Sequence, residues 1–196
     1  MDTMTSGLDL LLGLLAVPGS RDIDGEEIRG ITRLQKLLFL ILMEDDFKDR
    51  IDTDFIYHPY NFGPYSSVLL SELEALRTAE LVTMEKARLG SIMEMVDRTA
   101  VLLEEGDERE EEKFLEIYRI TERGMRVWNG LVAKKFTPEE IKHIVSIKRR
   151  FNDMAVDDLI RHVYERYPDY TTRSKIIEEV FGLGIRPDLT PFDREE

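Results

Sequence analysis

The sequence has no cysteine and only three histidines. The lack of cysteine excludes disulfides, thiolate metal sites and cysteine nucleophiles. The histidines, at positions 58, 143 and 162, are not spaced as metal ligands, and no cysteine can complete a site around them. No pair of carboxylates is singled out as an acid and base. The sequence therefore predicts no metal, no cofactor and no enzymatic activity.

Long apolar segments are also missing. The apolar stretch of residues 8–17 has no basic region before it and carries Asp9, with Asp2 upstream, so it does not resemble a signal peptide. The run of residues 37–43 is far too short to span a bilayer. We therefore expect a cytoplasmic protein that does not enter a membrane.

Basic residues are fewer than acidic ones: the sequence has 27 lysines and arginines and 40 aspartates and glutamates. The resulting net charge of −13 repels the nucleic-acid backbone on average, although a local basic patch could still bind it. The length of 196 residues suits one domain, and the composition is that of an ordinary globular protein.

Apolar periodicity predicts a mainly α-helical fold with a small β-hairpin. Helices are expected at residues 3–17, 26–45 and 65–79, and strands at 81–87 and 113–121. Residues 89–103 fit either a strand or a helix. A helix followed by a strand, a charged tip, a second strand and another helix is the order of a winged helix-turn-helix.

The C-terminal third is predicted to be helical. Thr137 and Pro138, followed by two glutamates, form a helix start signal. Further helices are expected near residues 155–168 and 172–184. The chain is thus interpreted as one domain of residues 1–196, whose parts are an N-terminal helix (1–20), a winged-helix-like core (26–136), a C-terminal helical part (137–184) and a loose tail (185–196).

Two short motifs occur in a fixed order. Residues 32–39 read TRLQKLLF, and residues 62–66 read FGPYS. This pair resembles the Panacea (SocA antitoxin-like) and YwgA-like group of prokaryotic proteins, which combine an LQKLL helix with an aromatic-Gly-Pro turn. The resemblance covers roughly residues 8–170 and implies an antitoxin or a protein-degradation adaptor. The chain departs from the antitoxin pattern, because it has no tryptophan-containing stretch before the turn.

The Gly-Pro turn itself is open to three interpretations. Gly63, Pro64, Tyr65 and Ser66 lack the second glycine and the lysine of a phosphate loop. A structural helix start, with Gly63 in a conformation that side chains resist and Pro64 in the first helical turn, is favoured over contact with a partner through Tyr65 and Ser66. A catalytic Ser66 is least favoured.

The helix before the turn supplies three polar candidates. Gln35 lies inside the apolar arc, so it is expected to hydrogen-bond the turn, with ligand or partner binding as the alternative. Arg33 and Lys36 are expected at the polar edge of this helix, on a solvated rim or in an interface.

Two charged segments favour opposite conclusions about nucleic-acid binding. Residues 104–112 contain seven acids and one base, which would repel DNA from the wing. Residues 134–150 carry six bases, and we interpret them as a polar helix face or as a surface that docks an acidic partner, a second copy or nucleic acid. The partner-binding candidates on this second segment are Lys142, Lys148, Arg149 and Arg150.

These observations favour a non-enzymatic regulatory protein that binds another protein, as an adaptor or an antitoxin-like factor. The alternative is a winged-helix transcriptional regulator that binds DNA through the basic C-terminal helix. A homodimer is compatible with either function.

Overall fold

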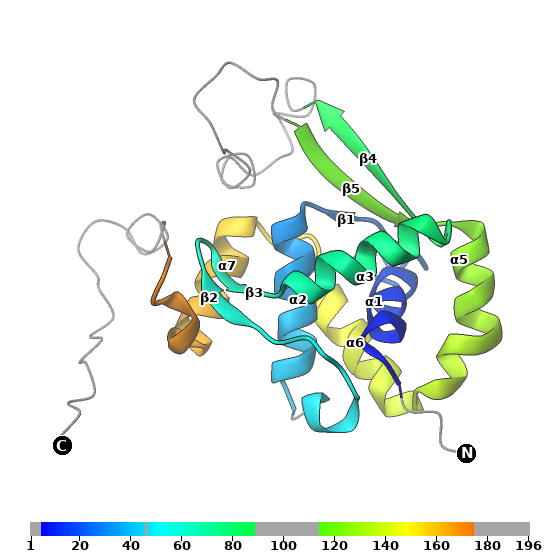
Figure 1. Cartoon of the computed structure of the whole chain (residues 1–196), viewed down its shortest axis with the longest axis horizontal. Helices are drawn as coiled ribbons and strands as arrows, with labels where there is room; N and C mark the ends of the chain where they lie inside the picture. Colours follow the sequence, from blue (N-terminus) through cyan, green and yellow to red (C-terminus); the bar gives the residue numbers. More distant parts are fainter. Residues whose placement is uncertain (1–4, 46, 89–113, 175–196) are drawn as a thin grey trace.

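The computed structural model describes residues 5–45, 47–88 and 114–174 (Figure 1). This part of the chain is mostly helical with a small antiparallel sheet, as the sequence predicts. The helices are α1 (Gly7–Ala16), α2 (Ile31–Met43), α3 (Ser67–Thr78), α5 (Glu122–Val127), α6 (Pro138–Phe151) and α7 (Val156–Arg166). The strands are β1 (Ile28–Arg29), β2 (His58–Tyr60), β3 (Gly63–Tyr65), β4 (Val82–Arg88) and β5 (Phe114–Ile120). Short 3₁₀ or π turns are η1 (Phe47–Arg50), η3 (Trp128–Val132), η4 (Ala133–Lys135) and η5 (Pro168–Thr171). Within these residues, no helix has the length and apolar character needed to cross a membrane.

Helix α2 forms the centre of the core, because it is apolar around nearly its whole circumference. Leu34, Leu37, Leu38 and Ile41 are all completely buried. Helices α6 and α7 pack against α2, and Figure 1 shows α3 crossing in front of it. The helix predicted from residue 26 in fact begins at Ile31. Gly30 interrupts the chain with φ +85°, a conformation that favours glycine, and residues 28–29 pair with β5 instead.

Helix α1 is buried almost throughout and has a well-defined start. Ser6 and Asp9 form a reciprocal capping box, with the Asp9 amide 3.2 Å from Ser6 Oγ and the Ser6 amide 3.0 Å from Asp9 Oδ2. Asp9 also accepts a hydrogen bond from Lys135 Nζ at 2.8 Å. These contacts pair the amides of Ser6 and Asp9 and the Asp9 carboxylate where an almost wholly apolar helix begins.

The sheet has the order β1-β5-β4 and is antiparallel. Strands β4 and β5 pair from Val82 opposite Ile120 to Arg88 opposite Phe114, which confirms both predicted strands. In Figure 1 the far ends of this pair extend away from the helices. The acidic segment 104–112 and the ambiguous residues 89–103 lie outside the described residues, so the prediction of an acidic wing tip stays a prediction.

The first two C-terminal helices, α6 and α7, occur as predicted. Thr137 caps α6 in a capping box with Glu140, whose amide is 3.2 Å from Thr137 Oγ1. Helix α7 places Leu159, Ile160 and Val163 in the core. Of the predicted last helix, residues 172–174 are described and are not helical, and the rest of it lies, with the tail, outside the described residues.

Candidate interaction surface on the β2–β3 ribbon

The Gly-Pro motif lies in a two-stranded ribbon rather than at the first turn of a helix. Strands β2 and β3 are antiparallel, with His58 opposite Tyr65, Pro59 opposite Pro64, and Tyr60 opposite Gly63. Helix α3 begins only at Ser67, so the predicted position of Pro64 in a first helical turn is wrong. Antiparallel pairs alternate between hydrogen-bonded and non-hydrogen-bonded types. The two prolines share one non-hydrogen-bonded pair, and their missing N–H groups therefore leave no gap in the ladder.

Gly63 is required where it stands. Its φ is +89°, in the left-handed region where side chains are strained. A Cβ atom there would come within 2.6 Å of Tyr164 Cε1 on α7. The expectation that Gly63 supplies a conformation resisted by side chains is confirmed, and the structure adds a steric reason, namely the close approach of Tyr164.

Substitution of Gly63 by alanine is expected to loosen the ribbon. Backbone strain at a positive φ costs about 1–3 kcal/mol, and the clash with the Tyr164 ring adds to it. We expect a loss of about 2–3 kcal/mol in the free energy of unfolding, measured by urea titration. The double variant Gly63→Ala/Tyr164→Leu removes the clash with the Tyr164 ring but keeps the backbone strain at the positive φ. It therefore separates the two contributions to the loss of stability. If the single substitution costs less than about 0.5 kcal/mol, this account of Gly63 is wrong.

Gln35 holds the end of the ribbon from below, as predicted. Its Nε2 donates to the Ser66 carbonyl at 2.9 Å, and its Oε1 accepts from the Ser66 amide at 3.1 Å. The side chain is buried, so these two bonds satisfy an amide that would otherwise be costly in the core. The pair joins the middle of α2 to the start of α3.

Lys36 lies beside Gln35 and is also buried, at 3% exposure. The expectation of a solvated or interfacial Lys36 is therefore wrong. Its Nζ donates to the Pro64 carbonyl of β3 at 3.0 Å. Burial lowers the pKa of the Lys36 amine to about 7, because a charged ammonium loses its hydration there.

Arg33 is likewise buried rather than exposed at a rim. Its guanidinium Nη1 donates to three carbonyls at the end of α6, those of Phe151 (3.2 Å), Asn152 (2.6 Å) and Met154 (2.6 Å). Carbonyls at a helix C-terminus have no partner within the helix, and a cation there also interacts favourably with the helix dipole. Arg33 is thus a cap for α6, not a partner-binding group.

Ser66 is fully buried, which contradicts its assignment to a partner-binding surface. It precedes α3 in the N-cap position, but its side chain makes no capping bond. Its Oγ has no hydrogen-bond partner among the described residues. A nucleophilic or partner-contacting Ser66 would have to be accessible from solvent, and its side chain is not accessible in this structure.

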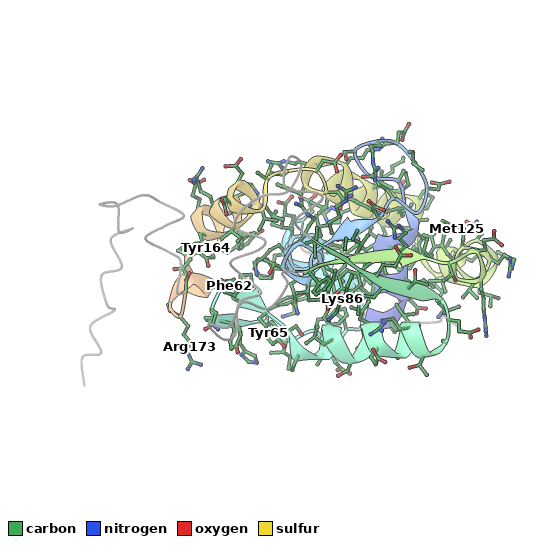
Figure 2. All side chains as sticks on the ribbon, turned by 90° about the horizontal axis from the view of Figure 1, so that it is seen from above. Phe62, Tyr65, Lys86, Met125, Tyr164 and Arg173 are labelled. Atoms are coloured by element: carbon green, nitrogen blue, oxygen red, sulfur yellow. The ribbon has the colours of Figure 1, made fainter. Side chains whose placement is uncertain are left out.

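The outer face of the ribbon, by contrast, is aromatic and accessible. The rings of Tyr60 and Tyr65 are in contact, with centroids 4.9 Å apart and planes tilted by 32°. Tyr60 is 49% exposed and Tyr65 is partly exposed. Ile56, just before β2, is 63% exposed, and Leu70 on the first turn of α3 is also exposed. Figure 2 shows Tyr65 toward the same end of the molecule as Tyr164, with Met125 of α5 at the opposite end. The ribbon surface is defined here as Ile56, Tyr60, Tyr65 and Leu70.

An aromatic cluster supports the ribbon from the side, and sequence reasoning missed it. The ring of Phe39 on α2 makes edge contacts at 4.9–5.1 Å between centroids with Tyr57, Tyr167 and Tyr170. Tyr57 comes just before β2, while Tyr167 and Tyr170 lie at the end of α7 and in η5. The tyrosines at 164, 167 and 170 recur every third residue, and that spacing is the signal that could have indicated a shared face.

The basic segment of α6 does not form one cationic face. Lys148 is completely buried and donates to the carbonyls of Leu15 and Val17 at the end of α1, at 3.3 and 2.8 Å. Burial lowers the pKa of its amine to about 7. Lys148 is therefore a cap like Arg33, and its assignment to a partner-binding surface is wrong.

The other cations of this segment are at the surface. Arg149 is exposed and forms an ion pair with Asp22. Arg150 lies over the Phe151 ring, 4.7 Å from its centroid, and Lys142 is exposed. The exposed positive charge is thus smaller than the sequence suggests, since one cation is inside and another is neutralised.

The histidines have ordinary structural surroundings. His58 is exposed on β2, and His143 Nε2 lies 2.9 Å from the Ile41 carbonyl at the end of α2. The ring of His162 contacts that of Phe151 at a tilt, with centroids 4.8 Å apart, and His162 Nε2 is 4.0 Å from Glu44 Oε1. Among the described residues, no three His, Asp or Glu side chains come together as metal ligands. The contacts given for His143 and His162 do not place either imidazole beside a nucleophile as a base.

Comparison of the sequence with protein-family models and with curated proteins found no match.

Proposed function

We propose that the protein is a non-enzymatic regulator that binds another protein through the ribbon surface. The observation that supports this most is the pair of contacting rings Tyr60 and Tyr65, accessible on a ribbon whose other side is fixed by buried side chains. Tyrosines on a rigid support bury large area at little entropic cost and are enriched at the centres of protein interfaces.

The chemistry of the partner follows from the surroundings of this surface. Ile56, before β2, and Leu70, on α3, add exposed aliphatic side chains to the ribbon surface. Asp52 and Asp54 are exposed just before Ile56, and the whole chain carries a net charge of −13. The occupant we propose is a protein segment with an apolar anchor and basic flanking residues, which would be attracted by this charge.

The resemblance of TRLQKLLF and FGPYS to the Panacea and YwgA-like group agrees with this proposal. An antitoxin or an adaptor acts by binding a protein, and the paired motifs are the parts of this chain that build the ribbon and its anchor. The proposal also retains the winged-helix-like core of residues 26–136, a cytoplasmic location, and homodimer formation. A second copy of the chain, being itself acidic, is a less favoured occupant of the ribbon surface.

Binding should depend on the two tyrosines. We expect Tyr60→Ala/Tyr65→Ala to weaken the affinity for the partner at least tenfold, the loss typical of removing an interface anchor. The partner is captured from extracts of cells that make the protein, purified, and titrated by calorimetry. Leu131→Ala serves as the matched control, because Leu131 is 67% exposed but lies on η3, away from the ribbon in Figure 1.

Equal affinities for the wild type and the tyrosine double variant would contradict the proposal. The alternative, a DNA-binding regulator, is tested with the same proteins by gel-shift on duplex DNA. Sub-micromolar binding at physiological salt that is lost in Lys142→Ala/Arg149→Ala/Arg150→Ala would support that alternative instead.

A further inference from the structure

We propose that the contact between Lys36 and Pro64 makes the ribbon a proton-controlled binding element, held against α2 when Lys36 is neutral and released when Lys36 takes up a proton. This inference deepens the proposed function, since control of binding presupposes that the ribbon binds. The response of the ribbon itself to pH does not depend on any partner.

The geometry places a titratable amine directly under the binding surface. Lys36 Nζ is 3.0 Å from the Pro64 carbonyl, and Tyr65, whose ring contacts that of Tyr60, is the next residue of β3. Within the described residues this carbonyl is the one hydrogen-bond acceptor of Lys36. With that single bond a neutral amine keeps one unpaired N–H group and its lone pair, whereas a buried ammonium keeps two unpaired N–H groups and a charge without compensation.

No neighbouring group among the described residues compensates that charge. Helix α7 presents the phenol of Tyr164, whose pKa burial raises to about 12, so it stays neutral. Strand β3 presents a backbone carbonyl, and α2 itself presents the neutral amide of Gln35. His58, on β2 opposite Tyr65, is exposed to water. Burial is the cause of the lowered pKa of Lys36, and release of the ribbon removes that cause.

The direction of the pH effect follows from the two states of the ribbon. In the held state the pKa of Lys36 is about 7, and in the released state a solvated lysine regains its ordinary value of 10.5. Between these values the released state binds one more proton, so a fall in pH favours release by up to about tenfold per pH unit. Below about pH 7 both states are protonated and the dependence ends.

Two other groups titrate in a neighbouring pH range, and one of them, Glu72, lies beside the segment that leads into β2. Lys148 has the same window, but it donates to the carbonyls at the end of α1. Glu72 on α3 has its pKa raised to about 7 by burial, with Asp54 and Asp9 contributing, so its window lies below pH 7. A variant at Lys36 therefore isolates the effect on the ribbon.

Hydrogen exchange at pH 7 and pH 9 tests the inference. The readout is the protection factor of the Ser66 amide, which bonds Gln35, relative to amides of the β4–β5 pair. In the wild type this ratio should rise between the two pH values, by up to about 100-fold at two pH units. In Lys36→Met it should stay high at both values, because no proton can bind. In Lys36→Arg, which is charged at both values, it should stay low.

An unchanged ratio in the wild type, or the same rise in Lys36→Met, would overturn the inference. Partner affinity measured at the same two pH values separates it from the proposed function. If the exchange pattern holds and the tyrosine double variant still binds normally, the control element stands and the proposed binding surface fails. If the tyrosines matter but the exchange ratio does not change, the reverse is true.

Discussion

Arg33→Leu is expected to destabilise the protein by about 3–5 kcal/mol, because it leaves several buried carbonyls unpaired at about 1–3 kcal/mol each. The substitution removes the donor to the carbonyls of Phe151, Asn152 and Met154, which remain in or near the core at the end of α6. Leucine cannot satisfy them, and each unpaired buried carbonyl is costly. Urea unfolding followed by circular dichroism measures the loss.

Arg149→Ala is the matched control for this substitution. Arg149 also lies near the end of α6, but it is exposed and pairs with Asp22 at the surface, so its removal should cost less than about 1 kcal/mol. Similar losses for the two variants, or a loss below about 1 kcal/mol for Arg33→Leu, would show that Arg33 is not an essential cap.

Leu38→Ala should cost about 2–5 kcal/mol, as other truncations of buried leucines do. Leu38 is completely buried on α2, the helix on which α6 and α7 pack, so little space is available for neighbours to collapse into the cavity. The same urea titration measures it. Leu131→Ala, at a largely exposed leucine, should change stability by less than about 0.5 kcal/mol. A loss below about 1 kcal/mol at Leu38 would contradict the central place of α2.

Much of the fold could be predicted from apolar periodicity, because long amphipathic segments bury their apolar side whatever they pack against. Helices α2, α3, α6 and α7 and strands β4 and β5 were found this way, within a few residues at their ends. Strand β1 was missed, since it has two residues and exists only through its pairing with β5, about 90 positions later in the chain.

The ribbon was missed for a related reason. His58–Tyr60 and Gly63–Tyr65 each contain a proline, and prolines in short segments indicate loops. What permits a ribbon is the register that sets Pro59 opposite Pro64, and a register cannot be deduced from either segment alone.

The buried cations could not be predicted either. Helical spacing places Arg33, Lys36 and Lys148 at the edge of an apolar arc, where long cationic side chains usually reach water. In the structure they reach backbone carbonyls instead, and those acceptors are separated from them by 28 to 133 positions in sequence. Every residue type has a backbone carbonyl, so a sequence motif cannot show which carbonyl a buried cation will bond.

The central claim, that the ribbon surface is where a protein partner binds, is tested most directly by site-specific photo-crosslinking. A photoreactive phenylalanine analogue is introduced at Tyr60, at Leu131 or at Met125 in otherwise unchanged protein, and each form is irradiated with the purified partner. We expect a crosslinked complex from position 60 and none from positions 131 and 125, which lie on or beside α5 at the other end of the molecule (Figures 1 and 2). Crosslinking from position 131 or 125 without crosslinking from position 60 would contradict the account.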